Sequence, residues 1–297
     1  IYLIIIKILK KTFHFTKNNN LLIKAISISS VGEAGIPIDN NLNPLIDIIP
    51  WYDQRTEQIR NNFLKKNKKF NIYKNTGLNS DHFYSAYKIL WIKKNKPNIY
   101  KKIYKWLPVN DYYSMKLTGN ISTDYSQAMR TLLFDPKKLN WSTTMITKFH
   151  IKQSILPKII NAGEKKGVFN KSIKKILGIN YDCVVGAGGH DHFVGIYGLN
   201  GFYKNTIVNS LGSAEAISIN TDKFLINNKL KNGKFISGVF KTKSRANFYI
   251  VGSILTSGII IDWFIKNFNI KNFDELNNMS LRFKKNLLFF PQFEFSH

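Results

Sequence analysis

Residues 182–192 read Asp-Cys-Val-Val-Gly-Ala-Gly-Gly-His-Asp-His, and this stretch decides the fold that we expect. Its apolar half, Asp182–Ala187, is typical of a buried strand, and Gly188-Gly189 predicts a tight turn. His192–Leu199 then continues as a helix with small residues for close packing. A strand that delivers Asp191 over a glycine turn places a carboxylate at the edge of a cleft, where it can act as a general base toward a hydroxyl. The alternative, favoured by the local sequence alone, is that Asp191 caps the helix.

A second glycine turn follows further along the chain. Residues 209–215 read Asn-Ser-Leu-Gly-Ser-Ala-Glu, which predicts a strand followed by a Gly-Ser turn. Free backbone N–H groups and a hydroxyl in such a turn suit the oxygens of a phosphate. Many hairpins also carry Gly-Ser, so a plain hairpin is the alternative. Upstream, Leu21–Ile28 alternates like a strand and leads into residues 29–35, a small-residue turn where the backbone can closely approach a ligand.

The hydrophobic periodicity along the rest of the chain predicts helices first and short strands later. We expect helices over residues 1–17, Asp53–Lys69, Asp81–Trp91, Asn98–Leu107, Asn110–Leu117 and Thr256–Asn267. We expect short strands at Ile36–Ile38, Thr206–Ser210, Ala216–Ile219, Lys234–Phe240 and Asn247–Val251. After Gly201 the predicted elements are mainly short strands, and this change predicts a domain boundary near residue 200.

Further motifs lie before and after the two glycine turns, and the turns themselves belong to the same series. They are Trp51–Thr56 (W-x-D-x-R), Asn75–Leu78 with Lys88 and Trp91, Leu117–Gly119, Thr123–Ala128, Thr131–Asp135, Gly188–Asp191, Leu211–Ser213, and Gly252 with Ser257-Gly258 and Asp262-Trp263. Their order and spacing, from about residue 22 to the end, resemble the FGGY family of carbohydrate kinases.

This resemblance implies an α/β protein with the ribonuclease-H-like (actin-like ATPase) two-domain fold, in which sugar and ATP meet in the cleft between the domains. Residues 1–200 would form the N-terminal, sugar-binding domain, and residues 201–297 the start of the C-terminal, ATP-binding domain. The implied activity is ATP-dependent phosphorylation of a sugar or polyol hydroxyl, with ATP and Mg²⁺ as cofactors. Asp191 would accept the proton of the attacking hydroxyl. Such phosphoryl transfer requires mostly positioning and charge stabilisation from the protein.

The resemblance also implies which residues bind the substrates. The sugar pocket would include Gly32, Glu33, Trp51, Phe83 and His192, while Gly212, Ser213, Gly258 and Asp262 would lie at the nucleotide; no residue is expected to hold a metal directly. Family members that use glycerol carry Arg-Glu where this chain has Gly32-Glu33. We expect the missing guanidinium to open space for a larger pentose, hexose or polyol.

Several of these residues have a structural alternative. Trp51 and Phe83 could be core aromatics rather than ligand contacts. Asp53 and Arg55 could form a structural pair, and Asp124 is better explained as a turn or cap residue than as a ligand.

The chain departs from the family pattern at both ends. Family members begin with a D-x-G-T-[ST] hairpin that serves Mg-phosphate, and no such stretch occurs here. The last residues, Phe289–Phe295, resemble a region that precedes the glycine-rich adenosine segment. We therefore expect an internal fragment that lacks the first strands and much of the ATP domain, with negligible kinase turnover by itself. The alternative is a non-catalytic, sugar-binding remnant of such a kinase.

The composition and net charge exclude few classes of function. The formal net charge of +26 makes nucleic-acid binding a further hypothesis, but the lysines are scattered and no binding motif accompanies them, which favours a solvated surface. We expect a sugar or polyol as partner, and neither nucleic acid nor membrane. The single Cys183 and the isolated histidines favour a reducing cytoplasm. The apolar run Ile1–Ile6 is too short to span a membrane and fits a truncated amphipathic helix, with a cut-off signal-peptide core as the alternative. The oligomeric state stays open, with a homodimer as one option.

Overall fold

The chain folds into a mixed α/β structure, which the computed structural model describes for residues 1–204, 206–212, 215–254 and 257–281. The helices are α1 (Tyr2–Asn18), α2 (Glu57–Lys66), α3 (Ile72–Thr76), α4 (Ser85–Asn95), α5 (Pro97–Lys102), α6 (Val109–Thr118), α7 (Tyr125–Met129), α8 (Thr143–Lys148), α9 (Lys171–Leu177), α10 (Asp191–Gly198), α11 (Asn228–Asn232), α12 (Gly258–Asn267) and α13 (Phe273–Leu281), with 3-10 helices at Gln54–Thr56 and Gln153–Ile155. The strands are β1 (Ala25–Ser30), β2 (Gly35–Ile38), β3 (Lys105–Pro108), β4 (Thr123–Asp124), β5 (Phe134–Asp135), β6 (Asn140–Trp141), β7 (Ile159–Ile160), β8 (Lys165–Val168), β9 (Val184–His190), β10 (Ile207–Leu211), β11 (Glu215–Thr221), β12 (Ile236–Lys241) and β13 (Ala246–Ile254).

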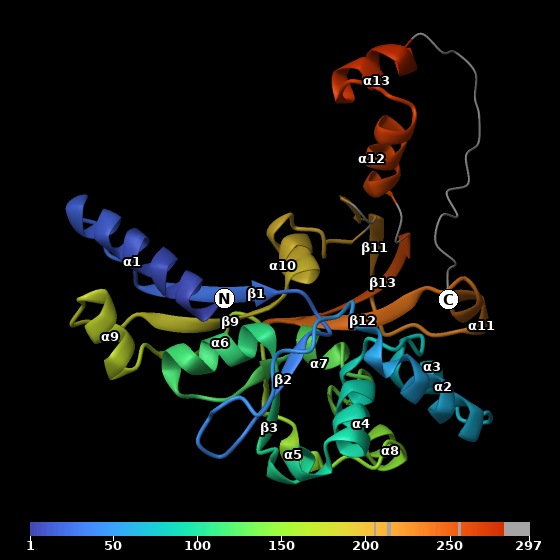
Figure 1. Cartoon of the computed structure of the whole chain (residues 1–297), viewed down its shortest axis with the longest axis horizontal. Coiled ribbons are helices and arrows are strands. Elements are labelled where there is room, and N and C mark those ends of the chain that lie inside the picture. Colours follow the sequence, from blue (N-terminus) through green and yellow to red (C-terminus); the bar gives the residue numbers. More distant parts are fainter. Residues whose placement is uncertain (205, 213–214, 255–256, 282–297) are drawn as a thin grey trace.

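Two sheets organise the molecule (Figure 1). The first has the order β1-β9-β8, with β1 parallel to β9 and β8 antiparallel to it. The second has the order β10-β11-β13-β12 and is antiparallel throughout. Because β1 and β9 are parallel neighbours, the segments that follow them leave the sheet at the same edge.

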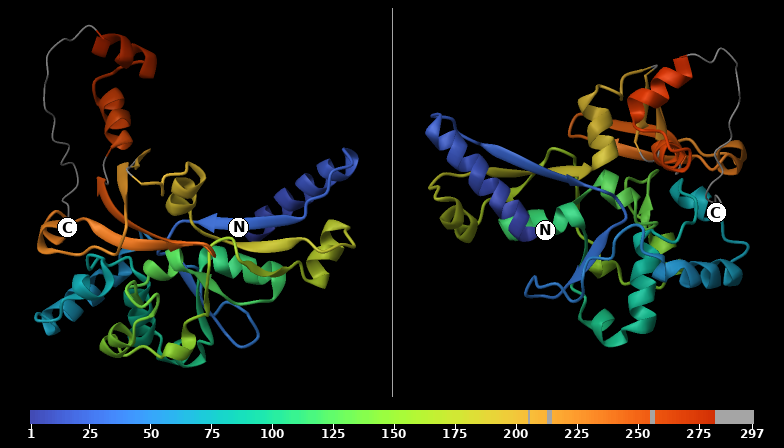
Figure 2. Two further views of the ribbon diagram at one scale, coloured as in Figure 1. Left: turned by 180° about the vertical axis from the view of Figure 1, so that it is seen from behind. Right: turned by 45° about the horizontal axis from the view of Figure 1, so that its top comes forward.

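Helices cover the first sheet and hold its strands in place. Helix α6 packs on β1, β9 and β8, while α1 packs against α9 at the end of the sheet (Figures 1 and 2). Phe13 of α1, Leu117 of α6, Ile173 of α9 and Val185 of β9 share one buried apolar cluster. Burial of such side chains is the main stabilising contribution to this layer.

A larger apolar core lies below the sheets, among α2, α4, α7 and α8. It includes Tyr87 and Ile89 of α4, Met145 of α8 and Phe149, and it reaches Val239 of β12. The second sheet therefore rests partly on the N-terminal half of the chain. A separate cluster joins α10 to the same sheet, where the ring of Phe193 stacks on that of Tyr249 at 4.1 Å. The division near residue 200 stays a prediction.

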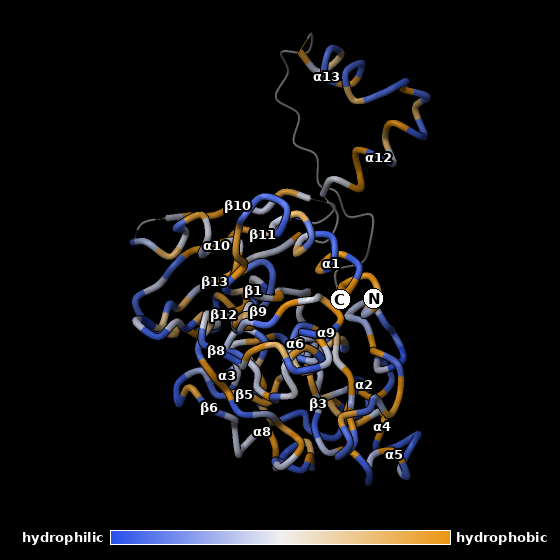
Figure 3. Tube along the Cα trace, turned by 90° about the vertical axis from the view of Figure 1, so that its left-hand side faces the viewer, coloured by the Kyte–Doolittle hydropathy of each residue, from blue (hydrophilic) through white to orange (hydrophobic). Residues whose placement is uncertain are grey.

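Helices α12 and α13 extend away from the body of the molecule (Figure 1). Their apolar residues are visible as orange segments in Figure 3, and Ile259, Trp263 and Phe268 are exposed. None of the helices among the described residues is long and apolar enough to cross a membrane.

Most predicted elements are confirmed with shifted ends, including the N-terminal helix (α1), the helix at 110–117 (α6) and the strands beyond residue 200. Two predictions are wrong. Asn98–Leu107 is helical only to Lys102, because Lys105–Pro108 pairs as β3 with the distant β2. Gly188-Gly189 is not a turn outside the strand, because β9 continues through both glycines to His190. Thr256, the expected start of α12, and Phe289–Phe295 lie outside the described residues.

Candidate active site

The parallel strands β1 and β9 bring two predicted site segments together. The chain leaves β1 into Gly32-Glu33 and leaves β9 into Asp191-His192. A Cβ atom at Gly32 would lie 2.5 Å from Cδ2 and 2.7 Å from Nε2 of His190. The imidazole of His190 therefore fills the space beside position 32. The expectation that the missing guanidinium opens space for a larger sugar stays a prediction.

Glycine is required at both positions before His190, because neighbouring atoms lie too close for a side chain. A Cβ atom at Gly188 would lie 2.0 Å from the carbonyl oxygen of Ile28, at the irregularity in the β1–β9 register. Gly189 has a φ of 106°, and a Cβ there would lie 2.7 Å from Oγ of Ser126. Only glycine adopts this conformation and contact without strain.

The start of α10 is tied to α7 by a buried serine. The backbone N–H of His190 donates to Ser126 Oγ at 2.9 Å, and the Ser126 hydroxyl donates in turn to Asp124 Oδ1. Asp124 is the N-cap of α7, as predicted. This connection fixes the position from which the Asp191 side chain projects.

Asp191 is the first residue of α10 rather than its cap, since His190 occupies the N-cap position. Its side chain is 41% exposed, and Oδ1 lies 2.8 Å from His190 Nδ1 and accepts a hydrogen bond from the His192 N–H at 2.8 Å. Burial alone would raise the pKa of the Asp191 carboxyl. The hydrogen bond with His190 and the charges of His190 and His192 outweigh burial, so the pKa lies below its ordinary value. Asp191 is therefore an ionised, accessible carboxylate at neutral pH, which is the form a proton acceptor needs.

His192 follows on the exposed side of the same helix start. Burial and the nearby charge of His190 lower its pKa below the ordinary value. At neutral pH the imidazole of His192 is therefore uncharged, so that one ring nitrogen can donate and the other can accept a hydrogen bond.

Glu33 adopts an unusual backbone conformation. Its φ is 59°, which is rare for a non-glycine residue and concentrates at functional sites. Its carboxylate forms an ion pair with Arg130, the residue after α7. Its carbonyl oxygen accepts a hydrogen bond of 2.5 Å from Lys88 Nζ.

Lys88 of α4 is fully buried and holds two predicted site segments together. Besides Glu33, its Nζ donates to the carbonyl oxygens of Ile49 at 3.3 Å and Pro50 at 2.9 Å. Pro50 immediately precedes Trp51. Burial lowers the pKa of Lys88 to about 8, although Glu33 and Asp53 favour its charged form.

We expect Lys88→Met to destabilise the fold by about 2–3 kcal/mol, because three buried carbonyl groups lose their donor. The unfolded chain binds more protons at this position than the folded chain between about pH 8 and the ordinary value of 10.5. The stability of the wild-type chain therefore gains from Lys88 as pH rises across this window, and the variant lacks this gain. Urea unfolding at pH 7 and pH 10 measures both effects.

Lys94→Met, on the exposed face of the same helix, is the matched control and should change stability by less than about 0.5 kcal/mol. If the difference in free energy of unfolding between wild type and Lys88→Met is the same at pH 7 and pH 10, Lys88 does not titrate as the structure implies.

The aromatic residues of the predicted pocket differ in burial. Trp51 is 44% exposed, so its interpretation as a core residue is wrong. Phe83 is half-buried and packs against the large core, with its ring 4.7 Å from that of Tyr84. The predicted pairing of Asp53 with Arg55 is confirmed, with Nη2 and Oδ2 2.7 Å apart.

The predicted nucleotide residues form a second group. Gly258 N–H donates to the carbonyl oxygen of Gly212 at 2.9 Å, so the residue directly after β10 adjoins the start of α12. Asp262 lies one turn along α12 and is exposed. Ser213 lies outside the described residues. No hydrogen bond within the described ranges joins this group directly to Glu33 or Asp191.

Sequence reasoning missed Arg130, His190 and Ser126. Each of the three also contacts a residue far away in the chain, and no local pattern reveals that distant partner. One signal was available for Arg130: the chain contains only five arginines among its many lysines, and Arg130 stands within an otherwise uncharged run. A lone arginine among so many lysines is a signal, because its planar guanidinium makes contacts that a lysine cannot make.

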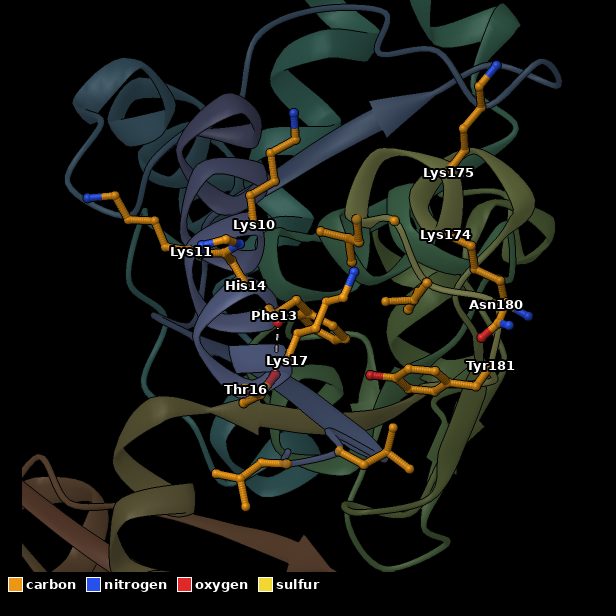
Figure 4. Close-up of a pocket in the computed structure, with 15 residues that line it drawn as sticks. Lys10, Lys11, Phe13, His14, Thr16, Lys17, Lys174, Lys175, Asn180 and Tyr181 are labelled. Carbon is orange, nitrogen blue, oxygen red and sulfur yellow. Dashed lines mark hydrogen bonds between the residues drawn. The ribbon is translucent and has the colours of Figure 1, made fainter. Parts of the chain in front are cut away.

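A surface pocket of about 1040 Å³ lies away from these residues, between α1 and α9 (Figure 4). Lys10, Lys17 and Lys174 line it together with Phe13 and Tyr181. It contains none of the predicted site residues and therefore adds nothing to the candidate active site.

Comparison with known proteins gives a consistent result. The model of the N-terminal domain of the FGGY family of carbohydrate kinases matches residues 2–198. A xylulose kinase of Staphylococcus xylosus is 31% identical over 255 residues, which cover 84% of this chain and 50% of the relative. A glycerol kinase of Thermococcus kodakarensis is 27% identical over 278 residues, covering 91% of this chain and 54% of the relative.

Solved structures agree at the level of the fold. The glycerol kinase of Plasmodium falciparum with ADP superposes with a TM-score of 0.86 at 25% identity, covering 95% of this chain and 57% of that one. The ligand-bound xylulose kinase of Lactobacillus acidophilus gives 0.83 at 22% identity, covering 95% and 56%. The chain spans about half the length of the curated relatives that it matches.

Proposed function

Because the chain belongs to the FGGY family of carbohydrate kinases, whose actin-like ATPase fold it shares, we propose that it serves ATP-dependent phosphorylation of a sugar or polyol hydroxyl. Asp191 acts as the general base in this reaction, and Gly32, Glu33, Trp51, Phe83 and His192 form the sugar pocket. A reducing cytoplasm is part of the proposal and agrees with the single, unpaired Cys183.

The proposal rests on the position, accessibility and ionised state of the Asp191 carboxylate. Its carboxylate is accessible and lies where β9 meets α10, and the neighbouring histidines hold its pKa below the ordinary value. Glu33 approaches the same place from β1, since His190 lies directly against Gly32. Two carboxylates at one edge of the sheet suit hydroxyl groups, which donate hydrogen bonds to carboxylate oxygens.

The group around Gly212 and Gly258 fits the oxygens of a nucleotide phosphate. The start of α12 presents backbone N–H groups, and a helix N-terminus favours negative charge. Bound Mg-ATP supplies the phosphoryl group. The chain's own contribution is to orient the sugar hydroxyl and accept its proton at Asp191.

For the 297 residues alone we propose sugar binding without measurable turnover, because the chain spans about half the length of the relatives. Xylulose, glycerol and fuculose are the first sugars and polyols to test, since relatives are named as kinases of these compounds. We expect one of them to raise the melting temperature in a thermal-shift titration. A coupled ATPase assay with the same compound should show no sugar-dependent rate.

Asp191→Asn separates the role of base from that of ligand contact. The amide keeps the size of the side chain but cannot accept a proton, so binding should weaken by less than about tenfold. In a form of the protein that is competent to use ATP, sugar-dependent turnover should fall by at least about 100-fold. Turnover that survives the substitution would remove Asp191 from the base position, and absence of any sugar-induced shift in the wild-type chain would overturn the proposed function itself.

A further inference from the structure

The pocket between α1 and α9 has an apolar interior. Phe13, Leu177, Ile179 and Tyr181 line it, and all four belong to the apolar cluster that joins α1, α9 and β9. Figure 4 shows the ring of Tyr181 along one side of the pocket, with its hydroxyl directed toward α1. The pocket therefore offers a surface on which an apolar ring can pack.

The rim of the same pocket is basic. Among the described residues that line it, five are lysines and none is Asp or Glu. Lys174 is paired with Asp182, the residue after Tyr181. Within the described part of the chain, no ion pair compensates the other four lysines, which are Lys10, Lys11, Lys17 and Lys175. The chain has no acidic residue before Glu33, so α1 contributes no negative side chain.

Stabilisation of the helix ends accounts for only part of this charge. Lys17 lies in the last turn of α1, and Lys174 and Lys175 lie in the last turn of α9, where a positive charge is favourable. Lys10 and Lys11 lie more than one turn before the end of α1, so they gain no such benefit. Close packing of like charges around one pocket is unfavourable unless a negative group lies among them.

An organic phosphate fits both halves of the pocket. A phosphate monoester carries between one and two negative charges at neutral pH and has three acceptor oxygens, to which lysine ammonium groups can donate. A flat ring attached to it would lie against Tyr181 and Phe13. The pocket volume of about 1040 Å³ has room for both parts.

We propose that the pocket between α1 and α9 binds an organic phosphate, with its ring system packed on Tyr181 and its phosphate group held by Lys10 and Lys17. This site is separate from the candidate active site, because none of the predicted site residues lines it. The proposal therefore stands or falls independently of the proposed function.

Calorimetric titration of the full 297-residue chain with three probes tests the proposal. The probes are 1-naphthyl phosphate, 1-naphthol, which lacks the phosphate, and inorganic phosphate, which lacks the ring. We expect 1-naphthyl phosphate to bind at least about tenfold more tightly than either of the others, because only this probe uses both halves of the pocket.

A pair of double variants with the same net charge locates the binding site. Lys10→Gln with Lys17→Gln should weaken 1-naphthyl phosphate by at least about tenfold, because two charged donors are lost. Lys7→Gln with Lys24→Gln removes two exposed lysines that do not line the pocket, and it should change the affinity by less than about twofold. Circular dichroism checks that each variant is folded.

Tyr181→Leu tests the contribution of the ring. This variant keeps an apolar side chain but removes the aromatic face, so 1-naphthyl phosphate should weaken by at least about threefold while inorganic phosphate is unaffected. The lysine variants decide the matter if Tyr181→Leu does not fold.

A solvated basic surface without a site predicts different results. In that case both lysine pairs would weaken 1-naphthyl phosphate equally, and this probe would bind no better than inorganic phosphate. Either result would overturn the proposal. Unchanged affinity in the variant of Lys10 and Lys17 would also overturn it, because the probe would then bind elsewhere, and so would absence of binding to the wild-type chain at millimolar concentration.

Discussion

Gly188→Ala is expected to destabilise the fold by about 3 kcal/mol or more, as measured by the urea midpoint. Insertion of a methyl group into a packed interior costs about 1–3 kcal/mol when side chains can move aside. Here the new methyl would lie 2.0 Å from the carbonyl oxygen and 2.4 Å from the carbonyl carbon of Ile28. Both are backbone atoms of the neighbouring strand and cannot rotate away. Relief therefore requires β1 and β9 to separate at the point that positions Asp191.

Gly195→Ala is the matched control for this substitution. Gly195 lies in α10, only a few residues away, and a Cβ atom there meets nothing within 4 Å. Alanine at an exposed position inside a helix is more favourable than glycine, so this variant should gain up to about 1 kcal/mol. Wild-type stability of Gly188→Ala would show that β1 and β9 are not in the observed register.

Residues 182–192 predicted local elements correctly but did not reveal their distant neighbours. The pattern indicated a buried strand, a special backbone at Gly188-Gly189 and a helix that starts near Asp191, and all three features are present. It did not show that both glycines lie within the strand. That property depends on β1, more than a hundred residues upstream, and local propensity contains no information about a distant neighbour's backbone.

Single residues of the candidate site could be predicted from the sequence. Contacts between residues from distant segments could not. Asp191 and Glu33 were identified from their motifs, and their roles stay predictions. Arg130 could not be assigned to Glu33, because 97 positions separate them and only the folded chain brings them together. The same limitation applies at Gly32. The sequence did not show that the ring of His190, from another strand, lies directly against Gly32.

Lys166→Met is expected to destabilise the fold by about 3–5 kcal/mol at pH 8, because it leaves a buried carboxylate without its cation. The side chain of Lys166 in β8 is 1% exposed, and its Nζ contacts Asp111 Oδ1 of α6 and donates to the Ser122 carbonyl oxygen at 3.0 Å. Asp124 lies close enough for its charge to raise the pKa of Asp111 further. Loss of Lys166 would thus leave two carboxylates in one buried region, next to the end of β9 that leads into Asp191.

The pH dependence distinguishes this electrostatic cause from a loss of packing. Burial raises the pKa of Asp111 to about 6, although Lys166 opposes the shift, and removal of Lys166 raises it further. A carboxyl with a raised pKa in the folded state favours folding at acid pH and loses that contribution as pH rises through the folded value. The difference in free energy of unfolding between wild type and Lys166→Met should therefore be smaller at pH 5 than at pH 8, because Asp111 in the variant takes up a proton at pH 5. Lys165→Met, the exposed neighbour in β8, should change stability by less than about 0.5 kcal/mol at either pH. An equal gap at both values would mean that Lys166 stabilises the fold by packing alone, and that Asp111 is not the charge it neutralises.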